Sequence, residues 1–327
     1  MSILNGLRQI KNASIKMVKE KLGAWLVFFA KNKNRRSMIH LKESKYHLNA
    51  AQVQYLISDA INQKKPFLVV RPGGVESEIT SFFIKKRLIK NSKGYRMEDL
   101  VRGELNAGIC PKDDRNFDKF SLAYLSVIAD SDLLLFYPWT AELCLRGFAE
   151  HTFNARYHDF DPLTAFNNGA PHWLQTLEGQ RVLIVCPFEN SIKKQYARLR
   201  EVQLVRDLWP ICDLKVISPP VTFAGNSTAT PWASELNSFL KKMDNIDYDV
   251  ALVAAGAYGP SIASHAKRSG RIGIHVGARL QLYFGILGRR WEGSALLAPH
   301  KPLAGWCRPC ETEIPSKATE IEGGCYW

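Results

Sequence analysis

The first candidate for chemistry is a glycine-rich turn, RPGGVESE at 71–78, that follows a short apolar run. Gly73 and Gly74 would let the backbone approach a ligand closely, and the helical pattern that follows would place a helix N-terminus, which favours anions, at the same point. Arg71 could pair with a phosphate through two hydrogen bonds. Glu76 could act as a base or bind a divalent cation. A structural turn with helix-capping acids explains the same residues without any ligand.

Two further turns follow apolar runs. In PFENS at 187–191, Ser191 could contact a substrate together with Gln195, one helical turn later. The alternative for Ser191 is a helix cap. The turn GAYG at 256–259 combines small side chains with free amides that would admit a phosphate or a sugar, but it lacks the G-x-G-x-x-G spacing typical of dinucleotide sites. The candidate ligand contacts in this turn are Gly256, Tyr258 and Gly259.

A polar cluster follows the last apolar run, in the sequence HVGARLQ at 275–281. His275 is a candidate catalytic residue, and Gly277 and Gln281 are candidate contacts to a sugar or a phosphate. Packed histidines are common in proteins, so a structural role for His275 is the alternative. Several polar residues beside a glycine at the end of an apolar run nevertheless favour a binding site.

The elements that must position these residues alternate along the chain. Apolar runs rich in β-branched residues predict strands, and stretches with helical spacing predict helices between them. Parallel neighbours need such crossover connections, so the pattern predicts a Rossmann-like α/β fold with a mainly parallel sheet, which binds ligands at the carboxyl ends of its strands. The predicted strands are 66–70, 132–137, 181–186, 214–218, 248–254 and 271–276, and the predicted helices are 50–63, 75–88, 191–202, 232–243 and 260–267.

The order of these elements suggests three parts. We expect a basic amphipathic lead at 1–45, a Rossmann-like α/β domain at 46–300, with halves at about 46–140 and 180–300, and a C-terminal tail at 301–327. The intervening stretch 141–178 is rich in aromatic residues, His and Asn, and we expect a helix followed by an irregular connection there.

The charge of the chain is concentrated at its beginning. The formal net charge is +13, and residues 1–45 hold 11 Lys or Arg against only Glu20 and Glu43. Apolar residues recur at helical spacing among these lysines, which predicts a basic amphipathic helix that either lies on an anionic membrane surface or docks on the body. Its apolar run, 22–30, is too short to span a membrane, and no clear cleavage site for a signal peptide follows it. Because the remaining body is only mildly basic, we expect no nucleic-acid partner.

The seven cysteines are scattered and odd in number, which argues against a disulfide framework and for a reducing compartment. We therefore expect a cytoplasmic protein, which could be peripheral at the inner face of the membrane. Cys307 and Cys310 form a C-x-x-C with Cys325 nearby, and His300 is a conceivable fourth zinc ligand. Free thiols are the alternative.

At this point a resemblance emerges. The segment VALVAAGAYGPSIASHAKRSGRIGIHVGARLQLYFGILGRRW (250–291), the strand RVLIVCPFENSIKKQY (181–196) and the ending EGGCYW (322–327) resemble a group of uncharacterised bacterial proteins. The likeness covers nearly everything after about residue 50. That group in turn resembles, more distantly, the GT-D type of glycosyltransferases.

The resemblance implies a Rossmann-like enzyme that takes a nucleotide-sugar donor and a glycan or lipid-linked acceptor, as in the synthesis of surface polysaccharide. GT-D enzymes carry an Asp-x-Glu metal motif in a context like R-x-G-D-x-E, and the matching residues here are Arg71, Gly73, Gly74 and Glu76. Gly74 stands where those enzymes have Asp, so Glu76 is the one matching ligand for Mn or Mg, and metal dependence stays open. A non-catalytic nucleotide-sugar or glycan-binding protein is the competing hypothesis.

Overall fold

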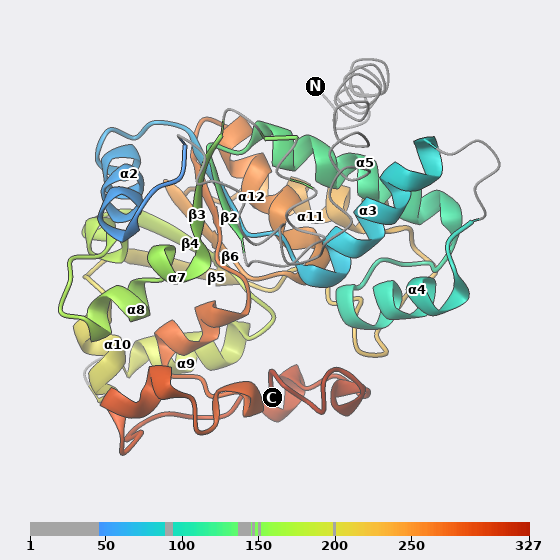
Figure 1. Cartoon of the computed structure of the whole chain (residues 1–327). Coiled ribbons are helices and arrows are strands. Elements are labelled where there is room, and N and C mark those ends of the chain that lie inside the picture. Colours follow the sequence, from blue (N-terminus) through green and yellow to red (C-terminus); the bar gives the residue numbers. More distant parts are fainter. Residues whose placement is uncertain (1–45, 89–93, 137–144, 146–147, 150–151, 199–200) are drawn as a thin grey trace, which may run out of the picture.

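The fold was analysed in a computed structural model, which describes residues 46–88, 94–136, 145, 148–149, 152–198 and 201–327. A seven-stranded sheet runs through the centre of the molecule, with helices on both of its faces (Figure 1). Every pairing between its strands is parallel. The predicted Rossmann-like class is thus confirmed. The amphipathic helix predicted for residues 1–45 lies outside the described residues.

The strand order is β3-β2-β1-β7-β6-β4-β5. The pairing of β1 with β7, with Phe67 opposite Ile272, joins the first three strands to the last four. The strands are β1 (Phe67–Val70), β2 (Leu133–Phe136), β3 (Phe153–Arg156), β4 (Arg181–Val185), β5 (Asp213–Ile217), β6 (Val250–Val253) and β7 (Ile272–His275).

The inner strands are buried on both faces because helices cover each side. All four residues of β1, β2, β6 and β7 are buried, which explains their continuous apolar sequences. One core lies between the sheet and the first helical layer. That layer consists of α3 (Gly74–Leu88), α4 (Met97–Arg102), α5 (Asp114–Asp130), α11 (Trp232–Asp244) and α12 (Gly259–Arg268).

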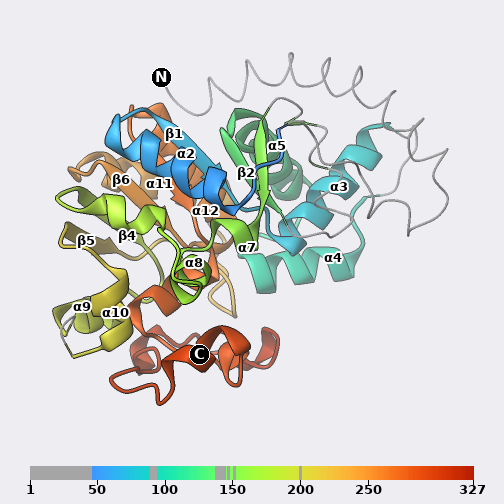
Figure 2. The same ribbon diagram turned by 60° about the vertical axis from the view of Figure 1, so that its left-hand side comes forward.

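A second core lies against the opposite face of the sheet. Figure 2, turned from the first view, shows this layer together with the C-terminal segment, drawn in red, next to it. The layer consists of α2 (Ala50–Asn62), α7 (Tyr157–Phe160), α8 (Pro162–Asn167), α9 (Glu189–Ala197), α10 (Gln203–Leu208) and the 3-10 segments η3 (Trp173–Leu177), η5 (Ala278–Phe284), η6 (Arg289–Trp291) and η7 (Ala295–His300).

The expectation for 141–178 was wrong in one respect. This stretch contains the edge strand β3, which pairs with β2. Its sequence, FNAR, exposes its first and last residues and carries polar side chains, so it lacks the apolar run by which buried strands are recognised. The described residues also include a π-helical turn, Gly103–Ala107, that extends α4.

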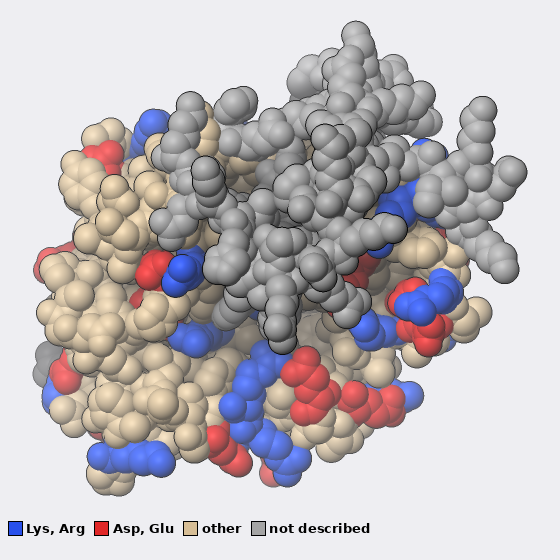
Figure 3. All heavy atoms as spheres, viewed as in Figure 1, with Lys and Arg blue, Asp and Glu red and all other residues tan. Residues whose placement is uncertain are grey.

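On the surface, the described body shows mixed charges. On the face seen in Figure 3, Lys and Arg side chains lie among Asp and Glu side chains and do not form one continuous basic patch. No helix in the described ranges is long and apolar enough to cross a membrane.

Candidate functional site

A cavity of about 570 Å³ opens at the carboxyl ends of the inner strands. Its floor comes from the residues directly after β1, β4, β6 and β7, including Arg71, Pro187, Ala255 and Val276. The volume falls within the range of small-molecule sites. The cavity therefore lies where parallel α/β sheets bind their ligands.

The path of the chain explains why the cavity opens there. After β1 the chain enters α3, which packs on one face of the sheet, and after β7 it enters η5, which packs on the other. Because β1 and β7 are neighbours, their two connections diverge and leave a crevice between them. Such a divergence is the usual binding site of open α/β sheets.

The turn after β1 gives the cavity a helix N-terminus. Gly73 and Gly74 line the wall at the start of the 15-residue helix α3. The Gly73 amide donates a hydrogen bond to the Tyr124 hydroxyl at 3.0 Å, which fixes the turn against α5. Arg71 also lines the wall, and its Cδ lies 3.7 Å from where a Cβ on Gly277 would be. The glycine at 277, at φ +73°, thus lets the arginine lie close to the backbone.

Glu76 is a half-buried carboxyl group in the first turn of α3. Its side chain folds back over Gly73, where any Cβ atom would collide with the carboxylate. Burial raises the pKa of Glu76, while a hydrogen bond from its own backbone and the charge of Arg71 lower it less strongly. A carboxyl group with a raised pKa beside Arg71 is suited to accept a proton near neutral pH.

His275 ends β7 and is only 5% exposed where it lines the cavity. Burial and the charge of Arg71 lower its pKa to about 3, against a hydrogen bond with the Arg71 backbone. The ring is therefore neutral at physiological pH. Its Nε2 atom packs against Gly259 at the start of α12, and its Nδ1 atom has no hydrogen-bond partner among the described residues.

Gln281 supplies a second buried polar atom to the cavity wall. The residue is 1% exposed, and its amide nitrogen donates to the backbone oxygens of Ile286 and Tyr326 at 3.3 and 3.2 Å. Its Oε1 atom has no partner in the described part of the chain. Buried polar groups are nearly always satisfied. Both residues line the cavity, but the unpaired atoms of Gln281 and His275 are themselves buried, so a ligand could reach them only after the side chains turn toward it.

The structure thus brings together eight of the residues singled out in the sequence. They come from the ends of three different strands and from η5. The residues of this group are Arg71, Gly73, Gly74, Glu76, Gly256, His275, Gly277 and Gln281.

Ser191 and Gln195, in contrast, lie outside the cavity. The backbone of Ser191 and its hydroxyl bind the carboxylate of Glu313, which lies against the N-terminus of α9. Gln195 donates to the backbone oxygens of Gly285 and Gly305 at 3.2 and 3.1 Å. The partner of Ser191 is therefore a carboxylate of the chain itself, and both residues hold the C-terminal part in place.

Tyr258 and Gly259 also lie behind the wall, away from the cavity. Tyr258 is 1% exposed and stacks on Trp232 at 5.5 Å between ring centroids, and its hydroxyl contacts Thr222 at 3.0 Å. Gly259 provides the space for the His275 ring. Their roles are structural, because the GAYG turn starts α12 and packs on the core below the site.

The sequence analysis missed much of the remaining wall. Three further arginines line the cavity: Arg102 pairs with Glu78, Arg279 with Asp161 and Arg290 with Glu322. The aromatic part of the lining comes largely from distant segments and consists of Tyr157, Phe188, Phe223, Trp291, Tyr326 and Trp327. The motif EGGCYW at the C-terminal end signalled its last two members, because two glycines before aromatic residues are typical of a tight, packed turn.

The donors around Glu76 do not form an obvious metal site. The described ranges contain no group of three His, Cys, Asp or Glu side chains that could hold an ion. The other two glutamates of the cavity, Glu78 and Glu322, are paired with arginines. His300, the conceivable zinc ligand, contacts Asn167 at 2.7 Å and stacks on Phe166.

Comparisons with known proteins add little beyond the fold. No family model matches the sequence, and no curated protein is similar to it. A solved structure described as the selenomethionine-substituted domain of unknown function 1792 is similar, with a TM-score of 0.39 and 13% identity. The similarity covers 74% of this chain and 80% of that chain. Likeness at this level does not extend to function.

Proposed function

We propose that the protein is a glycosyltransferase that moves a sugar from a nucleotide-sugar donor to a glycan or lipid-linked acceptor. One observation carries the proposal: a single cavity at the carboxyl edge of the sheet combines the N-terminus of α3, Arg71 and the half-buried carboxyl group of Glu76. Anions are stabilised at helix N-termini and by arginine. This wall therefore suits a diphosphate, and the likeness of the 250–291 segment to GT-D-related proteins points the same way.

In this mechanism Glu76 is the general base. The acceptor hydroxyl gives its proton to the Glu76 carboxylate as its oxygen attacks the anomeric carbon of the donor. The bond from that carbon to the diphosphate breaks, and the nucleoside diphosphate leaves with the bonding electrons. Arg71 and the amides at the start of α3 stabilise the charge that develops on the leaving group.

His275 and Gln281 would orient the sugar. Neutral imidazole and amide groups form hydrogen bonds with hydroxyl groups without a change of charge. Their unpaired atoms, Nδ1 and Oε1, are both buried in the cavity wall. A sugar that satisfies them removes the cost of leaving these atoms without partners.

Mn or Mg fits this donor set poorly. Mg requires six oxygen ligands in near-octahedral geometry. Of the three glutamates in the described lining, Glu78 and Glu322 are paired with arginines, and the third, Glu76, lies within the influence of the Arg71 charge. The proposed reaction therefore contains no metal step, and a comparison of turnover in Mn and in EDTA tests this point.

The test of the function is calorimetry of the purified full chain against UDP-, GDP- and dTDP-sugars, with and without Mn. We expect binding of at least one donor and slow release of its nucleoside diphosphate in the presence of water or an acceptor. Absence of binding to every donor would overturn the proposal.

The replacement of the expected Asp by Gly74 supports a second candidate, a non-catalytic nucleotide-sugar or glycan-binding protein. Glu76→Gln separates the two. An enzyme loses turnover in this variant, whereas a binding protein shows no turnover in either form and keeps its affinity for the ligand.

We also propose that residues 1–45 bring the protein to the inner face of the membrane, where lipid-linked acceptors lie. Their excess of Lys and Arg supports this proposal. Sedimentation with anionic vesicles should capture the full chain, and salt should release it; a chain without residues 1–45 that sediments equally well would contradict the proposal.

A further inference from the structure

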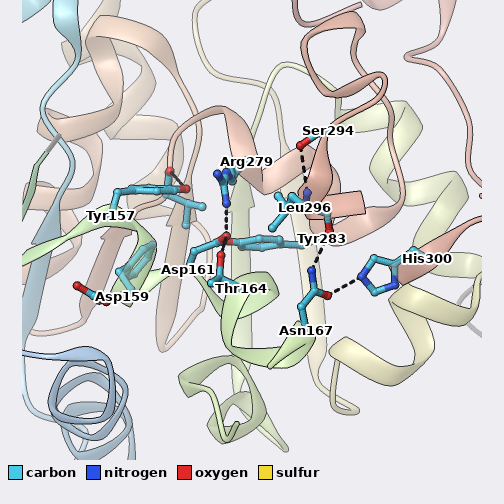
Figure 4. Close-up of polar contacts among 12 residues, drawn as sticks. Tyr157, Asp159, Asp161, Thr164, Asn167, Arg279, Tyr283, Ser294, Leu296 and His300 are labelled. Atoms are coloured by element: carbon cyan, nitrogen blue, oxygen red, sulfur yellow. Dashed lines mark hydrogen bonds and ion pairs between the residues drawn. The ribbon is translucent and has the colours of Figure 1, made fainter. Parts of the chain in front are cut away.

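A fully buried carboxylate holds one of the cavity arginines. Asp161 is 0% exposed, at the junction between α7 and α8. It forms an ion pair with Arg279, and it accepts hydrogen bonds from the Tyr283 hydroxyl at 2.7 Å and the Thr164 hydroxyl at 2.8 Å (Figure 4). Three donors from two segments, η5 and α8, therefore surround this one carboxylate.

Such an arrangement needs an explanation beyond stability. Burying a carboxylate and a guanidinium costs desolvation energy that their attraction barely repays, so buried ion pairs are weak evidence for a stabilising role. Here the carboxylate of Asp161 is fully buried, whereas the Arg279 side chain is 26% exposed and lines the cavity. The pair is thus oriented, with its anion in the core and its cation at the site.

The surroundings of Arg279 fix its direction. The guanidinium lies over the ring of Tyr157, 5.4 Å from the ring centroid, and Tyr157 itself donates to the backbone oxygen of Val276 at 2.9 Å. Figure 4 shows the arginine directly above the carboxylate of Asp161, with the Tyr157 ring beside it. Tyr157 and Val276 both line the cavity, so the same contacts that immobilise the arginine also belong to the wall.

Arg279 also lies close in sequence to the proposed diphosphate contacts. Gly277, two residues earlier, is the glycine against which Arg71 packs. Both arginines line the same cavity, Arg71 from the end of β1 and Arg279 from η5. Two guanidinium groups placed in this way can hold an oxyanion group by paired hydrogen bonds.

We propose that Arg279 binds an oxyanion of the ligand and that Asp161 is its positioning residue. The inference rests on the proposed nucleotide-sugar site. The oxyanion has one chemistry and two sources, the diphosphate of the donor or a carboxylate on an acidic sugar. The buried carboxylate acts through the arginine alone and does not touch the ligand.

The experiment measures dissociation constants by calorimetry for UDP, GDP, UDP-glucose, UDP-glucuronate and inorganic pyrophosphate. Wild type is compared with Arg279→Gln, Arg279→Lys, Asp161→Asn and the double variant. Arg181→Gln is the matched control, because Arg181 also pairs with aspartates but lies at the start of β4, at the opposite edge of the sheet. Circular dichroism confirms that each variant folds, and Tyr283→Phe replaces Asp161→Asn if that variant does not.

We expect Arg279→Gln to weaken binding at least tenfold, Arg279→Lys to restore only part of the loss, and Arg181→Gln to bind like wild type. A loss of affinity for UDP or pyrophosphate identifies the diphosphate as the oxyanion, and a loss confined to UDP-glucuronate identifies the sugar carboxylate. Asp161→Asn should weaken binding in the wild-type background and add nothing to Arg279→Gln, because a positioning residue has no effect once its arginine is gone.

The outcomes separate the two proposals. If wild type binds nucleoside diphosphates and Arg279→Gln binds them and UDP-glucuronate equally well, the inference is wrong and the proposed function stands. If wild type binds pyrophosphate through Arg279 but no nucleotide, the inference stands and the proposed function is wrong. An additive effect of Asp161→Asn in the Arg279→Gln background would overturn the positioning role.

Discussion

The carboxylate of Glu76 occupies the space that a Cβ atom on Gly73 would need. The glycine is therefore required by the position of an acid three residues later. Gly73→Ala should displace the carboxylate while leaving it in the chain. Because a displacement of about 1 Å can cost about 100-fold in rate, we expect kcat/KM for the nucleotide sugar to fall about 10- to 100-fold. Glu76→Gln combined with Gly73→Ala should show no further loss, and an additive loss would mean that the glycine acts separately.

The raised pKa of Glu76 predicts how its removal affects stability. The folded state holds the proton more tightly than the unfolded state, so folding is favoured below the unfolded pKa and loses this advantage as the pH rises through the folded pKa. Glu76→Gln should therefore increase the free energy of unfolding at pH 7 to 8, relative to wild type, and the difference should shrink below about pH 4.5. Urea titrations across this range measure it, and a difference that is independent of pH would contradict the raised pKa.

Two buried histidines predict a loss of stability in acid. Burial lowers the pKa of His275 to about 3 and that of His172 to about 4. Below pH 6.5 the unfolded state therefore binds protons on these two residues that the folded state does not bind. Stability should fall by about 1.4 kcal/mol per pH unit for each histidine between pH 6 and 4.

His172 is the control for the site, because it lies outside the cavity lining. His275→Gln and His172→Gln should each flatten the acid slope, but His275→Gln alone should weaken ligand binding. If wild type, His275→Gln and His172→Gln bound the ligand equally well, His275 would not be a ligand contact.

The contact between Ser191 and Glu313 predicts a variant that affects stability without function. Ser191→Ala removes a hydroxyl that binds the Glu313 carboxylate and accepts a hydrogen bond from the Cys310 amide at 2.8 Å. Unfolding free energy should fall by about 1 kcal/mol. The dissociation constant for a nucleoside diphosphate should stay within about twofold of wild type, and a larger change would restore Ser191 to the binding site.

The contact between β7 and α12 predicts a position that tolerates no side chain. A Cβ on Gly273 would collide with the backbone carbonyl of Ala263, which cannot rotate away as a side chain could. Gly273→Ala should lower the free energy of unfolding by about 1–3 kcal/mol, the usual cost of overpacking. Chemical denaturation measures it, with Ile272→Val on the same strand as a control that removes volume. A fully stable Gly273→Ala protein would contradict this packing.

The sequence predicted those parts of the fold that leave a local pattern. The buried inner strands are continuous apolar runs, and each predicted strand lies within about two residues of an observed one. The edge strand β3 and the short helices α7 and α8 carry no such pattern, because they are partly polar and only four to six residues long. Their conformation is fixed by tertiary contacts, such as the bond between Gln54 and the backbone of Phe160 at 3.1 Å.

The cavity wall was predictable where its residues follow directly from a strand. Arg71 and His275 were found because each lies at a strand end. Asp161 could not be found, because its importance depends on Arg279, 118 positions away in the chain. Ser191 lies outside the cavity, and the sequence could not show this for a related reason. A polar residue at the start of a helix after a strand has the same pattern whether its partner is a ligand or, as here, Glu313 from the C-terminal region.

The pairing of β1 with β7 has a consequence for folding during synthesis on the ribosome. Phe67 of β1 cannot pair until Ile272 of β7 has been synthesised. At typical elongation speeds of 5–20 residues per second, β1 therefore stays without β7 for about 10–40 s. Throughout this interval a wholly apolar strand presents unpaired backbone groups along one edge, which is the kind of surface that aggregates or is shielded by chaperones. The yield of folded protein in the cell should therefore depend on how well the unpaired edge of β1 is protected during synthesis, even for variants whose native state is stable.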